Sequence, residues 1–162
     1  MKSPLLRPLA VWLLISSVVL QSGAARLPVR SAMQEGGQAE VQLLVIRATD
    51  KNDKVDPELR EIADMLKKQY RLTGFKLESK VVKSVGLNTA VTATHKNYTA
   101  SVTPTKREER KVELVVSVTR REGDKDRTLI DKSKTHSTQG KLALYGGFRD
   151  GDDTLIIAAG AK

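Results

Sequence analysis

The sequence predicts an α+β fold in which one amphipathic helix packs on a mainly antiparallel sheet of about six to eight short strands. Two observations carry this prediction. Residues Pro57–Tyr70 show helical spacing of their apolar side chains, and the apolar run Val41–Ala48 comes just before them. Short strand patterns separated by turn residues fill the rest of the chain. Connections this short favour antiparallel pairing after the helix.

The helix has start and stop signals as well as a periodic apolar face. Asp56 suits the N-cap, Pro57 suits the first helical position, and Gly74 permits an exit turn. The residues with helical spacing form one apolar stripe: Leu59, Ile62, Ala63, Leu66 and Tyr70. We therefore expect this stripe to face the sheet.

The strands on either side of the helix differ in pattern. Val41–Ala48 is apolar at both odd and even positions, which is typical of a central strand buried on both faces. We expect the helix to cover one of those faces. Phe75–Ser84 alternates instead, so Phe75, Leu77 and Val81 are predicted to share one face of the next strand.

Six further strands are expected between turn signals. Pro104 is predicted to end one strand, and Gly146-Gly147, with the turn Asp150-Gly151-Asp152, is predicted to separate the last two. The expected strands are Thr89–Thr94, Tyr98–Thr103, Val112–Val118, Arg127–Lys132, Lys141–Tyr145 and Thr154–Ala159.

The N-terminus has the pattern of a secretory signal peptide. Lys2 and Arg7 precede the apolar run Leu9–Leu20, and small residues lead to a predicted cleavage site after Ala25. The run is shorter than the roughly 20 apolar residues of a membrane span, although a retained anchor is the alternative. The predicted organisation is a signal peptide at 1–25, a flexible lead-in at 26–40 and a single α+β domain at 41–162. The predicted location is periplasmic or secreted.

Composition excludes several kinds of chemistry. The chain has no cysteine, which rules out disulfides, thiolate metal sites and a cysteine nucleophile. Aromatic residues make up only 4% of the chain, so the core must consist of Val, Leu, Ile and Ala.

The positive charge is unevenly distributed. The formal net charge is +9, and Glu78 is the only acidic residue between Met65 and Arg107. The helix end and the following strand are expected to form a basic surface that contacts an acidic protein, an acidic polymer or an anionic membrane. Nucleic acid is disfavoured by export and by the scarcity of stacking side chains. Solubility and protection of a strand edge are the alternative explanation. The candidate contact residues are Lys67, Lys68, Arg71, Lys76, Lys80 and Lys83.

No catalytic, metal or cofactor motif stands out. His95 and His136 are expected to be exposed turn residues, because neither belongs to a ligand or triad pattern. The loop Asp50–Asp56 lacks the residues of a calcium loop, and Asp150–Asp153 is expected to be a hairpin turn rather than a cation site. We therefore predict no catalytic residue, no metal site and no cofactor.

Two segments carry a resemblance. The strand, DPEL and helix start at Val41–Leu59 and the ending GGFRDGDDTLIIAAG at Gly146–Gly160 resemble uncharacterised exported bacterial α+β domains. The resemblance implies a cell-envelope or secreted location and transfers no catalytic residue.

Three functional hypotheses follow. The first is an exported, non-enzymatic binding or interaction module whose ligand the sequence does not identify. The second is a hydrolase whose acidic residues are dispersed in the sequence and brought together by folding. The third is a structural envelope component that assembles through a strand edge.

Overall fold

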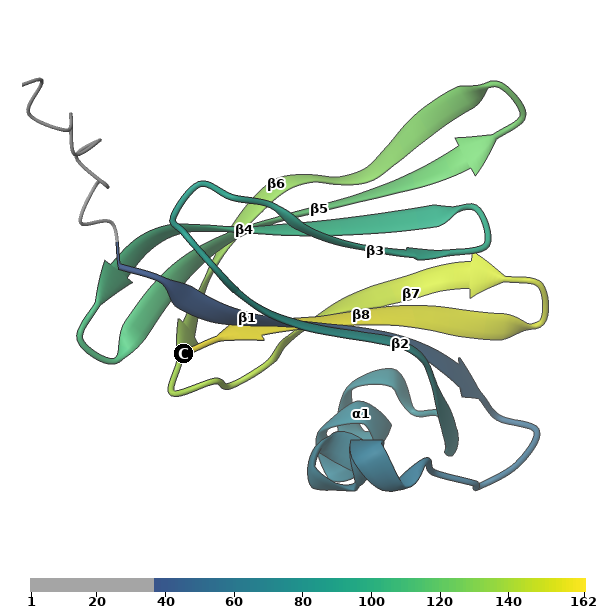
Figure 1. The fold of residues 1–162 in the computed structure, drawn as a ribbon. Helices are drawn as coiled ribbons and strands as arrows, with labels where there is room; N and C mark the ends of the chain where they lie inside the picture. The colour runs from purple at the N-terminus through teal and green to yellow at the C-terminus, as the bar shows by residue number, and fades with distance from the viewer. Residues whose placement is uncertain (1–36) are drawn as a thin grey trace, which may run out of the picture. The chain divides into compact units, whose positions relative to one another are not determined.

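The computed structural model describes residues 37–162, which form two antiparallel four-stranded sheets and one helical segment (Figure 1). The predicted signal peptide and most of the predicted lead-in lie outside the described residues. Mainly antiparallel pairing with one helix is confirmed. The strands form two sheets rather than one, however, and the fold is mostly β because the helix is short. The strands are β1 Ala39–Thr49, β2 Gly74–Val85, β3 Val91–His95, β4 Tyr98–Glu108, β5 Lys111–Glu122, β6 Lys125–Thr138, β7 Ala143–Asp150 and β8 Asp153–Ala161.

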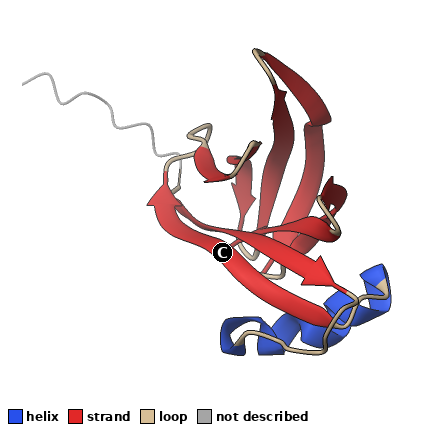
Figure 2. Ribbon diagram, turned by 90° about the vertical axis from the view of Figure 1, so that its right-hand side faces the viewer, coloured by secondary structure: helices blue, strands red, loops and turns tan. Residues whose placement is uncertain are grey.

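The two sheets have simple orders. Sheet A runs β2-β1-β8-β7, and sheet B runs β3-β4-β5-β6. The prediction that Val41–Ala48 is a central strand is confirmed, because β1 pairs with β2 on one side and with β8 on the other. The sheets pack face to face, and the helix covers the other side of sheet A, so the domain has three layers (Figure 2).

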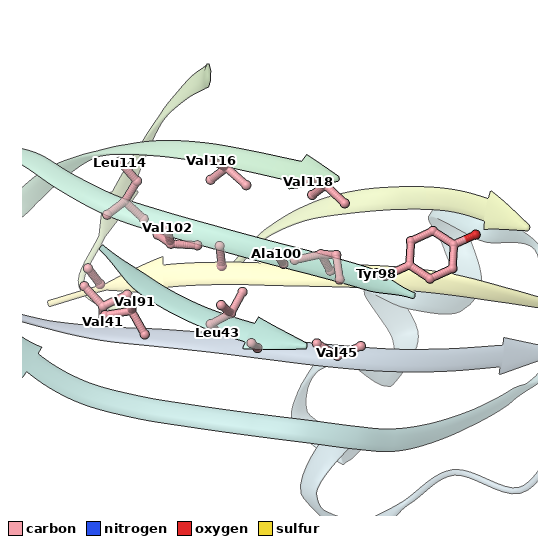
Figure 3. Close-up of a cluster of buried hydrophobic side chains, with 14 of the residues drawn as sticks. Val41, Leu43, Val45, Val91, Tyr98, Ala100, Val102, Leu114, Val116 and Val118 are labelled. Atoms are coloured by element: carbon pink, nitrogen blue, oxygen red, sulfur yellow. The ribbon is translucent and has the colours of Figure 1, made fainter. Parts of the chain in front are cut away.

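The main core lies between the sheets (Figure 3). It takes alternate residues of each strand, such as Val41, Leu43 and Val45 of β1, as period-2 side-chain geometry requires. Sheet B contributes Val102, Leu114 and other branched side chains that Figure 3 shows between the strands. The core is built largely of Val, Leu, Ile and Ala, and Tyr98 is the one aromatic residue among its buried members in residues 37–162.

A second core fills the space between sheet A and the helix. Leu44, Ile46 and Ala48 use the other face of β1, and they pack with Leu59 and Leu66 of the helical segment. This confirms that β1 is buried on both faces and that the apolar stripe of the helix points toward the sheet.

The helical segment has two parts. Pro57–Ile62 is a 3-10 helix (η1) and Ala63–Tyr70 is an α-helix (α1). Pro57 lies in the first turn, as predicted. Asp56 makes no capping bond; its Oδ2 instead accepts a hydrogen bond from the Leu77 N–H at 2.8 Å. Arg71, not Gly74, takes the left-handed conformation that ends the helix, with φ 56°.

The second strand differs from its predicted sidedness because it contains a β-bulge. Val45 pairs with Ser79 and Ile46 pairs with Leu77, which leaves Glu78 as the extra residue. Phe75 and Leu77 therefore pack toward the helix, whereas Val81 packs toward the core between the sheets. The apolar residues on both sides of the bulge have odd numbers, so the sequence pattern shows no break. In the structure, however, those before the bulge and Val81 after it lie on opposite faces of the sheet.

Two predicted strand ends are also wrong, again because of bulges. β4 continues through Pro104 to Glu108, with a register shift between Pro104 and Lys106. β7 continues through Gly146-Gly147, with a shift between Gly146 and Phe148. Gly147 has φ +87°, which glycine adopts without strain. Bulges accommodate the extra residue without ending the strand.

At one end of the sandwich a buried hydroxyl joins the sheets. Ser137 of β6 is 1% exposed, and its Oγ accepts a hydrogen bond from the Ala161 N–H of β8 at 2.8 Å. The same Oγ lies 2.8 Å from the Ala161 carbonyl and 2.9 Å from the Lys141 carbonyl. One hydroxyl proton can serve only one of these two acceptors at a time.

Candidate functional site: a charged end of the sandwich

The other end of the sandwich is closed by charged side chains. On β1 the inward series Val41, Leu43, Val45 is followed at the next inward position by Arg47. On β8, Asp153 lies on the same face as Leu155, and on β3, His95 follows the inward-facing Ala93. β1 and β3 end and β8 begins at this end of the molecule, which is on the right in Figure 1. We call these residues and their ion-pair partners the charged end.

Arg47 is at the centre of the part that lies on sheet A. Its Nε is 2.9 Å from Glu78 Oε1, and its Nη1 is 3.8 Å from Asp153 Oδ2. Lys76 Nζ approaches the same Glu78 oxygen at 3.3 Å. The Glu78 side chain is only 15% exposed, and this oxygen has ion-pair contacts but no well-directed hydrogen bond. The bulge that displaces Glu78 thus places a largely buried carboxylate between two cations.

His95 and Asp150 connect the two sheets. His95 Nε2 of β3 is 3.6 Å from Asp150 Oδ2 of β7, and Lys96 Nζ is 2.8 Å from the same oxygen. The side chains of His95 and Asp150 are 14% and 10% exposed, so the expectation that His95 is a solvent-exposed turn residue is wrong. Its Nε2 is buried without a hydrogen-bond partner among the described residues.

The pKa of Asp150 reflects these neighbours. Burial alone would raise the pKa of this carboxyl, but the hydrogen bond from Lys96 and the charges of Lys96 and His95 outweigh burial and lower it. Asp150 is therefore held in its ionised form, and its negative charge is available to both sheets.

A polar hollow of about 330 Å³ adjoins Arg47. It lies where the loop after β1 folds back on the start of β2, and this loop forms a parallel bridge between Val55 and Phe75. Gly74 is needed here, because a Cβ at this position would come within 2.6 Å of Asn52 Oδ1. Four cations contribute to the lining, against two carboxylates. The lining residues are Arg47, Thr49, Lys51, Asn52, Lys54, Asp56, Gly74, Phe75, Lys76 and Asp153.

The six bases predicted to form one surface do not lie on one face. Lys80 points toward the helix side of sheet A and pairs with Glu58 at 2.6 Å, whereas Lys83 is in register with the inward-facing Val41. Lys76 belongs to the charged end. Lys67, Lys68 and Arg71 remain together on the exposed side of α1 and have no ion-pair partner within residues 37–162.

The carboxylates of the acidic turn after β7 pair with basic side chains. Asp150 pairs with Lys96, Asp152 pairs with Lys51 at 2.9 Å, and Asp153 lies near Arg47, so each carboxylate has a different cationic partner. No cluster of three or more metal-ligating side chains occurs in the described part of the chain. The expected hairpin turn at Asp150–Asp153 is confirmed, with Gly151 at φ +67°.

His136 lies apart from the charged end. Its Nε2 is 3.7 Å from Glu113 Oε2 on the outer side of sheet B, and its side chain is half exposed. It lies within β6 rather than in a turn. Its exposure was predicted correctly, but its place in a strand was not.

The carboxyl pKa values that shift clearly all move in the same direction. A carboxylic acid that donates a proton near neutral pH needs a raised pKa. Every Asp or Glu pKa with a clear shift in residues 37–162 moves down instead, through hydrogen bonds or charges from neighbouring residues: Glu108, Glu113, Asp150 and Asp152. These four carboxyls are therefore held in their ionised form near neutral pH.

Sequence reasoning missed Arg47, Glu78, Asp150 and His95 as a group. The available signal was the phase of the strands, because Arg47 continues the inward period-2 series that begins at Val41. A charged residue in phase with a buried series indicates either an end of the core or an ion pair. The partner could not be identified, because it comes from a bulge on another strand.

Comparisons with protein-family models, characterised proteins and solved structures find no match for this chain. Among residues 37–162, no helix has the length and apolar character needed to cross a bilayer. The resemblance to exported bacterial domains therefore remains a prediction.

Proposed function

We propose that the protein is an exported, non-enzymatic binding module that recognises an acidic polymer or an acidic stretch of another protein. The contact surface is the basic corner, defined here as Lys54, Lys67, Lys68 and Arg71. The observation that carries the proposal is that these four bases are exposed and have no anionic partner within residues 37–162. Export rests on the predicted signal peptide alone.

The basic corner is held together by the main chain. The Thr73 N–H donates to the Thr49 carbonyl at 3.2 Å, and Thr73 Oγ1 donates to the Asn52 carbonyl at 2.6 Å. The Phe75 N–H donates to the Lys54 carbonyl at 2.8 Å. These bonds fix the chain that leaves α1 against the loop that carries Lys54, and we infer from this that the four cations share one surface.

An acidic polymer suits this surface better than a bilayer does. Peripheral membrane surfaces combine bases with large apolar side chains that insert among the lipids. Only Met65 and Val82 are exposed large apolar residues in residues 37–162, and neither belongs to the basic corner. Exposed cations attract an extended polyanion without insertion, and that attraction weakens as salt screens the charges.

Binding of the full-length protein to polyglutamate, measured by fluorescence anisotropy at low and at physiological salt, tests the proposal. The triple variant Lys54→Glu, Lys67→Glu, Arg71→Glu should bind about tenfold more weakly, because three lost contacts of about 0.5 kcal/mol each sum to about 1.5 kcal/mol and tenfold corresponds to 1.4 kcal/mol. The control variant Arg121→Glu, Lys125→Glu, Lys134→Glu changes the net charge equally on three exposed bases of β5 and β6.

Equal weakening by the two triple variants would show that only net charge matters and would overturn the proposed surface. Binding to phosphatidylglycerol vesicles without binding to polyglutamate would overturn the choice of partner.

A further inference from the structure

We propose that two copies of this protein pair through the outer edge of β7, so that sheet A continues from one copy into the other. This inference is independent of the basic corner. It rests on a difference among the four strand edges of the sandwich, on the apolar side chains beside β7, and on the charge of the chain.

Three of the four edges carry features that prevent pairing. β2 carries Lys76, Lys80 and Lys83 along its length and contains the bulge at Glu78. β6 carries lysines and two register shifts, and β3 is only five residues long. Lysines, bulges and short edge strands are the devices that proteins use to prevent edge-to-edge association.

β7 lacks most of this protection. Its segment Ala143–Phe148, with the sequence ALYGGF, has no charged residue and no proline, and its only irregularity is the bulge at Gly147. Within residues 37–162, β7 pairs only with β8. Beyond that pairing, no hydrogen bond joins the main-chain groups of Ala143–Phe148 to any other part of residues 37–162. The outer edge of β7 therefore presents unpaired donors and acceptors.

Apolar side chains beside this edge remain partly exposed. Tyr145 and Phe148 of β7 pack against the rim of the main core, as do Leu129 and Ile130 of β6. All four are only partly buried, because β7 and β6 belong to different sheets and do not pair. A strand added to β7 would bury more of this apolar surface and also satisfy the main-chain groups, so both effects favour association.

The lack of charge on this edge favours a second copy of β7 as the added strand. The chain has a net charge of +9, so identical copies repel one another over most of their surface. An acidic partner would instead be expected to dock where bases gather, and this edge has none before Arg149. Antiparallel pairing of β7 with its own copy about a two-fold axis is self-complementary and brings two uncharged segments together.

The absence of cysteine in the chain allows a direct test. Single cysteines are introduced into the full-length protein at Ala143, Tyr145 or Arg149 of β7, and at Lys83 of β2 or Lys134 of β6 as controls. Paired strands lie about 4.8 Å apart, within the Cα separations that a disulfide spans. Under mild oxidation, the β7 position nearest the two-fold axis should give at least about tenfold more disulfide-linked dimer than either control.

The pattern of yields separates edge pairing from other association. In an antiparallel pair, two copies of the same residue lie farther apart the farther that residue is from the two-fold axis. The yield should therefore fall at the other two β7 positions. Equal yields at all five positions, or no dimer from any β7 position, would overturn the proposal. Association through another part of the chain would not favour one position on β7.

A second pair of variants tests the edge of β7. Each is made in the single-cysteine variant that gives the most disulfide-linked dimer. Gly147 is exposed, and a Cβ there would meet no atom within 4 Å. Gly147→Lys and Gly147→Gln carry the same backbone strain from the positive φ and have side chains of similar length. The lysine variant should lose the dimer and the glutamine variant should keep it, while the two variants unfold at the same temperature. Equal dimer yields from the two variants would contradict pairing through this edge.

Discussion

The two ends of the sandwich are closed by different chemistry. At one end, the buried hydroxyl of Ser137 joins β6 to β8 through neutral hydrogen bonds. At the other end, Asp150 of β7 faces His95 of sheet B and Lys96 of the turn that follows it, and Arg47 lies between Glu78 and Asp153 within sheet A. Both arrangements join strands that the core alone would hold only through apolar contacts.

This difference indicates which end responds to pH. A neutral hydroxyl does not titrate in the accessible range, whereas a carboxylate whose pKa is lowered by folding links stability to pH. The contribution of the neutral end should therefore not change with pH, and the contribution of Asp150 at the charged end should be present only while this carboxyl is ionised. The following predictions test this contrast, from the largest expected effect to the smallest.

Ser137→Ala should cost the most, about 2 kcal/mol of unfolding free energy, because it leaves the buried Ala161 N–H without its acceptor. The loss should be the same at pH 7 and pH 4 when measured by urea denaturation. Ser133→Ala is the matched control. Ser133 lies on β6, the strand that also carries Ser137, and is in register with Val116 of β5, but it makes no side-chain hydrogen bond among the described residues. A clear pH dependence of the Ser137→Ala effect would contradict the assignment of the neutral end.

Asp150→Asn should cost about 1.5 kcal/mol at pH 7, since it removes charge-assisted contacts with Lys96 and His95. The pKa of Asp150 is lower in the folded than in the unfolded protein. Its stabilisation is therefore fully present above the unfolded pKa of about 3.9 and is lost as the pH falls through the lower folded value. The unfolding free energies of the wild type and the variant should converge as the pH falls below about 4.

Asp152→Asn provides the comparison for that measurement. The pKa of Asp152 is also lowered, by the hydrogen bond from Lys51, but this pair is exposed to solvent. Its effect should be smaller than that of Asp150→Asn and should disappear at high salt. If the two variants gave identical pH profiles, the burial of Asp150 at the charged end would have no energetic consequence.

Lys80→Gln should have the smallest effect on the free energy of unfolding, below about 0.5 kcal/mol, because the side chains of Lys80 and its partner Glu58 are both exposed to solvent. Thermal unfolding at low and high salt would measure it. A loss of more than about 1 kcal/mol would show that this ion pair helps to hold η1 on the sheet and that the charged end is not the only electrostatic contribution to stability.

The parts of the fold that follow from local pattern could be predicted from the sequence. Val41–Ala48 was identified as a strand buried on both faces because its apolar residues occupy odd and even positions, and the stripe from Leu59 to Tyr70 predicted which side of the helix packs. The division into two sheets could not be predicted in this way. Alternating patterns show that a strand has a buried face, but they do not show which strand lies opposite it.

The charged end could be predicted even less well, for a related reason. Arg47, Glu78, Asp150 and His95 come from four strands in two sheets, and the position of Glu78 depends on a bulge. The prediction that the bases of the helix and of β2 form one surface assumed that successive side chains of β2 point to alternate faces of the sheet without interruption. The bulge placed Lys80 on the helix side and left Lys83 in register with Val41 on the inward side. The closeness of Lys67, Lys68 and Arg71 depends on local sequence alone, because they fall within about one helical turn at the end of α1.

The same bulge makes Glu78 the one residue that the pairing of β1 with β2 does not require. Because Leu77 and Ser79 already pair with adjacent residues of β1, loss of the single Glu78 codon would leave a regular ladder with every neighbouring side chain on its present face. In genetic terms, this is a position where an in-frame deletion should preserve the fold while removing the carboxylate shared by Arg47 and Lys76. The electrostatics of the charged end can therefore change by one codon, independently of the architecture that carries it.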